Sequence, residues 1–146
     1  MKNFIYSSLL ITNLFIIGCT GADYPVINVK VSHVYDIDSL NKSQIYNKLL
    51  KWISLNTRWS KSVIDYKDND VGTIVVKAKV SAWDEFNKIY IQCIFEFNTK
   101  DNKVKLDITN NDDEHFISKY DLNEFKKSLE NISKDVYEYL KKKDDF

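Results

Sequence analysis

The sequence predicts an α+β domain of two layers, in which a five-stranded antiparallel sheet carries two helices on one face. Three observations support this prediction. Five segments alternate apolar and polar residues, the period of a half-buried strand, and two others repeat apolar residues at steps of three and four, the period of an amphipathic helix. The 146 residues include only three Gly and one Pro, which favours long regular elements joined by short turns. The order strand, helix, four strands, helix allows two helices to cover the apolar face of one sheet.

The first strand and the first helix lie in the first third of the domain. The strand is expected over 26–35, where every second residue is apolar. The helix is expected over 39–56, and either Ser39 or Asn41 can cap its start. Trp52 lies on the apolar side of this helix and is expected in the core.

Four further strands are expected at 62–67, 73–83, 88–98 and 103–109. The turns between them are short and rich in Asp, Asn, Gly and Lys, so neighbouring strands are expected to pair antiparallel. Strict alternation places Asp65 and Lys67 on the face of the sheet that points away from the helices.

The last helix is expected from Asp121 or Leu122 to about Lys142. Its apolar stripe consists of Leu122, Phe125, Leu129, Ile132, Val136 and Tyr139. Six such side chains bury enough apolar surface to supply a large part of the net stability of a small domain.

The N-terminus reads as a targeting segment. Lys2 is followed by 14 uncharged residues, Phe4 to Ile17, which are too few for a membrane-spanning helix but suit the apolar region of a signal peptide. The alternative is a first buried strand or helix of the fold. The unbroken apolar character favours the signal peptide, because an element of the domain would show a polar face.

The run ends in Ile16-Ile17-Gly18-Cys19, which resembles the lipobox of bacterial lipoproteins. The resemblance implies cleavage before Cys19 and attachment of diacylglycerol and a further acyl chain, such as palmitate, to that cysteine. Two or more acyl chains hold a protein stably at a membrane. The implied organisation is a signal peptide over 1–18, a lipidated tether over 19–24 and one globular domain over 25–146. By resemblance to the sorting of enterobacterial lipoproteins, Thr20 after the cysteine implies the outer membrane of the cell envelope, with the globular part outside the cytoplasm.

Composition excludes one class of partner. The chain has 21 Lys plus Arg and 21 Asp plus Glu. Loss of 1–18 removes one lysine, so the mature part carries 20 basic against 21 acidic residues, a formal charge of −1. A nearly neutral domain lacks the basic surface that binds a phosphate backbone, so no nucleic acid partner is expected.

The globular part has a second resemblance. The element order, together with Lys51-Trp52, the stretch 62–66 and Gly72-Thr73-Ile74, is similar to an uncharacterised bacterial family of unknown function with a fold like that of the TATA-box-binding protein. The resemblance covers about Val26 to Leu140. It implies a curved antiparallel sheet backed by helices, and it supplies no catalytic residues. A fold of this kind does not by itself imply DNA binding.

The open face of the sheet is the candidate binding surface. Val75, Tyr90 and Ile94 are apolar positions in a polar setting, and they can form a small patch for a partner in the envelope. The alternative is an ordinary solvated face with scattered apolar residues. Trp83 and Phe86, near the turn after the third strand, either anchor a partner or close one edge of the core.

Catalysis has weak support in the sequence. His33 is in register with the apolar side of its strand and is expected to be a partnered structural residue, and Cys93 is expected to be a buried, inert thiol. The only polar cluster that an enzyme of the envelope could use is Asp112-Asp113-Glu114-His115, which also reads as a solvated acidic loop. We therefore expect no catalytic residue, metal or cofactor, and a non-enzymatic binding module. An enzyme using residues 112–115, or an inhibitor or immunity-type lipoprotein, are the alternatives.

Overall fold

The computed structural model describes residues 29–56, 63–84, 87–110 and 119–142. Its elements are β1 (Lys30–Asp36), α1 (Lys42–Leu55), β2 (Val63–Asp68), β3 (Thr73–Asp84), β4 (Asn87–Lys100), β5 (Lys103–Asn110) and α2 (Lys119–Lys141). The predicted order of strand, helix, four strands and helix is confirmed, as is the α+β class. No helix in these described ranges is long and apolar enough to cross a membrane.

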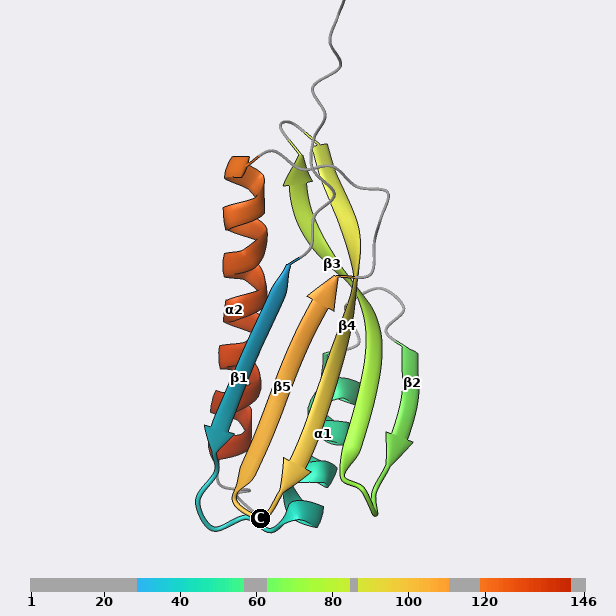
Figure 1. Ribbon diagram of the computed structural model, residues 1–146, viewed down its shortest axis with the longest axis vertical. Helices are drawn as coiled ribbons and strands as arrows, with labels where there is room; N and C mark the ends of the chain where they lie inside the picture. The colour runs from blue at the N-terminus through green and yellow to red at the C-terminus, as the bar shows by residue number, and fades with distance from the viewer. Residues whose placement is uncertain (1–28, 57–62, 85–86, 111–118, 143–146) are drawn as a thin grey trace, which may run out of the picture.

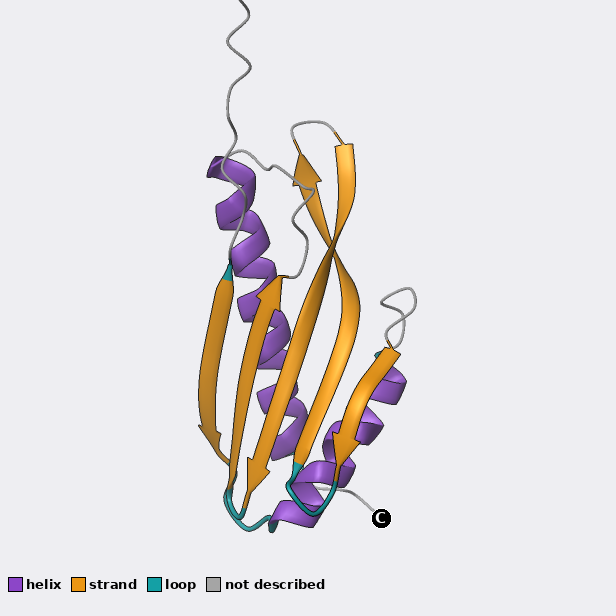
Figure 2. Cartoon of the chain, turned by 45° about the vertical axis from the view of Figure 1, so that its right-hand side comes forward, coloured by secondary structure: helices purple, strands orange, loops and turns teal. Residues whose placement is uncertain are grey.

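The five strands form one sheet in the order β1-β5-β4-β3-β2, and every neighbouring pair is antiparallel. Strands β2 to β5 follow one another as hairpins, as the short turns predicted. The sequence did not reveal the place of β1, which pairs with β5 along its whole length, from Lys30 opposite Thr109 to Asp36 opposite Lys103. The hairpin of β3 and β4 extends beyond the ends of the other strands (Figure 2).

Both helices lie against the same face of the sheet, which leaves the other face uncovered by any described helix or strand (Figure 1). Along most of β3, β4 and β5 every second residue points toward the helices and is buried, and β1 adds Val31. The buried strand residues are Val31, Ile74, Val76, Ala78, Val80, Ala82, Ile91, Cys93, Phe95, Phe97, Thr99, Val104, Leu106 and Ile108. The core therefore lies between the layers, where each layer hides the apolar surface of the other from water.

Helix α1 begins at a capping box. The side chain of Asn41 accepts a hydrogen bond from the Gln44 amide, and the Gln44 side chain accepts one from the Asn41 amide. Asn41 is therefore the cap, and Ser39 lies outside the helix with a φ of 68°. The carboxylate of Asp101, in the β4–β5 turn, accepts from the Lys42 amide at 2.8 Å, which adds negative charge at the positive end of the helix.

Helix α2 lies along the sheet and carries the expected apolar stripe. Phe125, Leu129 and Val136 are almost completely buried, and Leu122, Ile132 and Tyr139 are partly buried against the same core. The helix also buries Leu140 and Ser133, and the Ser133 hydroxyl is 2.7 Å from the Tyr35 hydroxyl on β1. This bond satisfies a buried polar group that the sequence pattern did not single out.

Candidate functional site

The open face of the sheet consists of the residues that alternate with the buried ones. They are Lys30, Ser32 and Val34 on β1, Lys105, Asp107 and Thr109 on β5, Tyr90, Gln92, Ile94, Glu96 and Asn98 on β4, and Thr73, Val75, Lys77, Lys79 and Ser81 on β3. The face is mainly polar, as expected of an antiparallel sheet with one side in water.

The structure brings two of the predicted patch residues together and places the third apart. Ile94 is opposite Lys77 and Val75 is opposite Glu96, so Val75 and Ile94 are diagonal neighbours on adjacent strands. Tyr90 is opposite Ser81, four residues along β4 from Ile94, which is about 13 Å in an extended strand. The ammonium of Lys88 lies over the Tyr90 ring at 5.7 Å from its centroid. Tyr90 is therefore a separate aromatic position near the end of the hairpin.

A residue that the sequence did not single out joins Val75 and Ile94. The register of β2 shifts by one residue between Ile64 and Tyr66, so Tyr66 lies opposite Val75 and Lys67 lies opposite the buried Ile74. The expectation that Lys67 lies on the open face is wrong, because this bulge reverses the alternation beyond Asp65. Tyr66 is 50% exposed. We call Tyr66, Val75 and Ile94 the sheet-face patch.

Charged side chains surround the sheet-face patch in paired positions. Lys77 lies 3.0 Å from Asp65, and Lys105 lies 2.7 Å from Asp107. Ser32 donates a further hydrogen bond to Asp107. Burial by itself would raise the pKa of Asp107, but the hydrogen bonds from Lys105 and Ser32 and the charge of Lys30 outweigh it and hold that pKa below its ordinary value. Asp107 is therefore ionised at neutral pH, and the border of the patch is charged.

The hydroxyl of Tyr66 is held by a neighbouring carboxylate. It donates to Asp68 at 3.1 Å, and this hydrogen bond, together with burial and the nearby negative charge, raises the pKa of Tyr66. Backbone hydrogen bonds from Val71 and Asp70, and the bond from Tyr66, lower the pKa of Asp68. The phenol is thus a neutral donor at neutral pH, and its ring is fixed beside Val75.

The other predicted residues have separate locations. The backbone of Trp83 pairs with Lys88 near the end of β3, but the Trp83 side chain and Phe86 lie outside the described residues. The loop Asp112-Asp113-Glu114-His115 and Cys19 also lie outside them. Cys93 is fully buried in β4.

His33 is a partnered structural residue, as expected. Its Nε2 lies 2.6 Å from Glu130 of α2, and its ring stacks on Tyr35. Within the part of the chain that the structure describes, no group of three or more His, Cys, Asp or Glu residues is placed to hold a metal ion.

Residues 32–112 match the model of a domain of unknown function with a TBP-like fold, DUF4468. The chain belongs to the DUF4468 family. The match runs from β1 to just beyond β5, so it is shorter than the expected resemblance over 26–140 and does not include α2.

Two solved structures have a similar fold. One is a TBP-like protein from Parabacteroides distasonis, with 18% identity, 80% of this chain and 96% of that chain covered, and a TM-score of 0.62. The other is a DUF4468 family protein from Bacteroides ovatus, with 14% identity, coverage of 84% and 93%, and a TM-score of 0.55. At these identities the similarity establishes the TBP-like fold alone. No curated protein matches this DUF4468 chain.

Proposed function

We propose that this protein is a lipid-anchored, non-enzymatic binding module of the bacterial cell envelope, and that its sheet-face patch contacts another envelope protein. The observation that carries the proposal is the adjacency of Tyr66, Val75 and Ile94 on a face that no described helix or strand covers. An apolar centre with an aromatic residue, bordered by charged groups, is the usual arrangement of a protein–protein interface.

The charged border of the sheet-face patch favours specific binding of one partner over non-specific hydrophobic association. The pairs Lys77–Asp65 and Lys105–Asp107 hold both signs of charge close to the patch. A partner must present complementary charges around an apolar centre, and a partner of the wrong pattern is rejected.

The lipid anchor rests on the lipobox and is tested separately. Changing Cys19 to Ala is expected to remove the protein from the detergent phase in a phase-partition experiment, because the residue that carries the acyl chains is lost. Metabolic labelling with a fatty acid should disappear from the same variant. Labelling and partitioning that equal those of the unchanged protein would refute the anchor and leave the binding proposal standing.

The partner is sought by cross-linking in intact cells with the full chain, followed by identification of the captured protein by mass spectrometry. Changing Ile94 to Lys is expected to reduce capture of a specific envelope protein by about tenfold or more, since a charge in the centre of an interface is costly.

The matched control is Tyr90→Lys, which adds the same charge on the same strand and face but outside the sheet-face patch. It should leave capture unchanged, and both variants should keep the thermal unfolding midpoint of the parent protein. Equal loss in both variants, or no loss in either, would overturn the assignment of the patch.

A further inference from the structure

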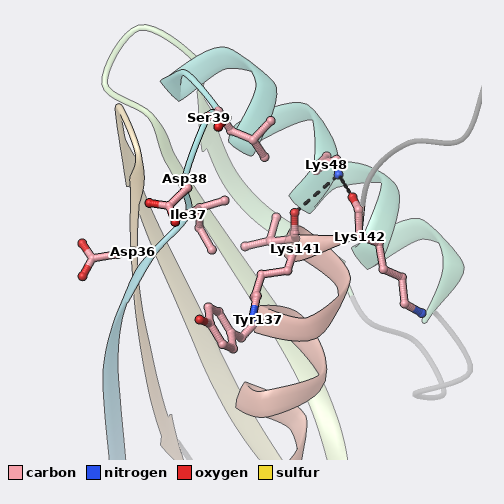
Figure 3. Close-up of a pocket in the computed structure, with 10 residues that line it drawn as sticks. Asp36, Ile37, Asp38, Ser39, Lys48, Tyr137, Lys141 and Lys142 are labelled. Carbon is pink, nitrogen blue, oxygen red and sulfur yellow. Dashed lines mark hydrogen bonds between the residues drawn. The ribbon is translucent and has the colours of Figure 1, made fainter.

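A concave site separate from the sheet-face patch lies at the C-terminal end of α2. It is a cavity of about 480 Å³ between the β1–α1 connection and the last turn of α2 (Figure 3). Pockets that hold small molecules in proteins usually measure about 300–1,000 Å³. The sheet-face patch contributes no residue to it.

The wall formed by the β1–α1 connection is held in place by the backbone. Ile37 donates to the carbonyl of Asn102 at 2.8 Å, and the Asn102 amide donates to the carbonyl of Leu40 at 2.9 Å. Ser39, between them, has a φ of 68°, an uncommon conformation for a residue other than glycine. The β4–β5 turn thus fixes this connection, and a fixed wall lowers the entropy lost on binding a ligand.

The opposite wall is fixed by a buried ammonium. Lys48 of α1 is only 9% exposed, and its Nζ donates to the carbonyls of Lys142 at 2.5 Å and Leu140 at 3.4 Å. The ammonium satisfies carbonyl groups that have no partner inside the helix and offsets the negative end of the α2 dipole. The last turn of α2 is therefore tied to α1.

The two walls carry opposite charges. Asp36 ends β1 and Asp38 belongs to the β1–α1 connection, while Lys141 and the hydroxyl of Tyr137 belong to α2 across the cavity (Figure 3). The Asp36 carboxylate forms an ion pair with the Lys103 ammonium at 3.5 Å. Asp38 makes no ion pair or hydrogen bond with the described residues, so its carboxylate is available to a ligand.

The floor between the charged groups is apolar and aromatic. Ile37 and Leu140 lie beneath the cavity and are almost completely buried, and Leu40, which is only partly buried, leaves apolar surface open to it. The Tyr137 ring is stacked on Tyr35 at 4.6 Å between centroids, and the Lys141 ammonium lies over that ring at 4.9 Å from its centroid. The stacking orients the phenol, and the ring holds the ammonium near the cavity.

We propose that this cavity binds a small zwitterion, namely an amino acid or short peptide with a free amine and a free carboxylate. The amine is held by Asp38, the carboxylate accepts from Lys141 and from the Tyr137 hydroxyl, and the side chain rests on the partly buried Leu40. The C-terminal end of α2 disfavours anions, and the ammonium groups of Lys48 and Lys141 offset this more readily for a singly charged carboxylate than for a doubly charged phosphate.

The test is calorimetric titration of the full chain in detergent with three probes, the dipeptide Ala-Leu, N-acetyl-Ala-Leu, and Ala-Leu amide. Ala-Leu should bind, and each singly charged analogue should bind about tenfold more weakly or worse, because one charged hydrogen bond is lost. Asp38→Asn should weaken Ala-Leu and Ala-Leu amide but not the acetylated probe. Lys141→Gln should weaken Ala-Leu and the acetylated probe but not the amide.

The control variant is Lys134→Gln, which removes an exposed lysine of the same helix outside the cavity and should leave all three affinities unchanged. If Ala-Leu at about 10 mM produced no binding heat, the proposal would be overturned. Equal affinities for the three probes would also overturn it. So would variants that lower all three affinities alike. These outcomes do not depend on the sheet-face patch or on the lipid anchor.

Discussion

Deletion of residues 128–146 is expected to leave a chain that shows no cooperative unfolding transition. The deletion removes Leu129, Val136 and Leu140, which are at most 1% exposed, and it uncovers the buried face of the sheet along the length of α2. At about 1.5–3 kcal/mol for each fully buried side chain, these three residues alone contribute an amount similar to the net stability of roughly 5–15 kcal/mol of a typical domain. Thermal unfolding followed by near-ultraviolet circular dichroism measures the result.

The matched control is a chain that ends at Lys142, because it removes only residues beyond the last described turn of α2. It should unfold cooperatively with nearly the midpoint of the full chain. A sharp transition in the longer deletion would mean that the sheet and α1 form a stable unit alone, which contradicts the two-layer core.

Substitution of Gly72 by Ala is expected to destabilise the domain by about 2 kcal/mol or more. Gly72 has a φ of 82°, a region that costs an L-residue about 1–2 kcal/mol. An added Cβ would also lie 2.6 Å from Oγ1 and 2.7 Å from the carbonyl oxygen of Thr99, and the second of these atoms is backbone. For a domain of this size the thermal midpoint should fall by roughly 8 °C.

The surroundings of Gly72 explain why a small shift of the turn cannot restore the stability lost in the Gly72→Ala variant. Its carbonyl accepts from both the amide and the hydroxyl of Thr99 at 2.8 Å, so movement of the turn breaks bonds to β4. Val71→Ala, at a neighbouring residue that is 66% exposed, should change the free energy of unfolding by less than about 0.5 kcal/mol. A Gly72→Ala variant as stable as this control would show that the turn accommodates a Cβ without the predicted strain.

Most of the fold could be predicted because its elements are long and periodic. The stripe that contains Phe125, Leu129 and Val136 identified α2, and alternation identified β3 and β4, since each pattern matches a single secondary structure. The neighbour of β1 could not be predicted in this way. The pairing of β1 with β5 joins residues far apart in the sequence, and no local pattern in either strand identifies its partner.

The candidate site was predicted less completely, and the reasons are local. A single extra residue at the bulge placed Tyr66 beside Val75, which strict alternation cannot foresee. The separation of Tyr90 from Ile94 follows from their spacing on one strand, so it could have been found from the sequence. Lys48 reads as a surface lysine in a helix, and only the meeting of α1 with the end of α2 explains its burial.

The position of β1 has a consequence for how the chain is assembled. Its partner, β5, lies far along the chain, because the hydrogen bond between Ser32 and Asp107 joins residues 75 positions apart. Closing so long a loop is entropically costly, so β1 is expected to dock after the β2–β5 hairpins have formed. A chain that crosses a membrane N-terminus first would then keep its first strand unpaired until almost the whole domain has emerged. The docking of β1 along β5 would then be the step that completes the sheet.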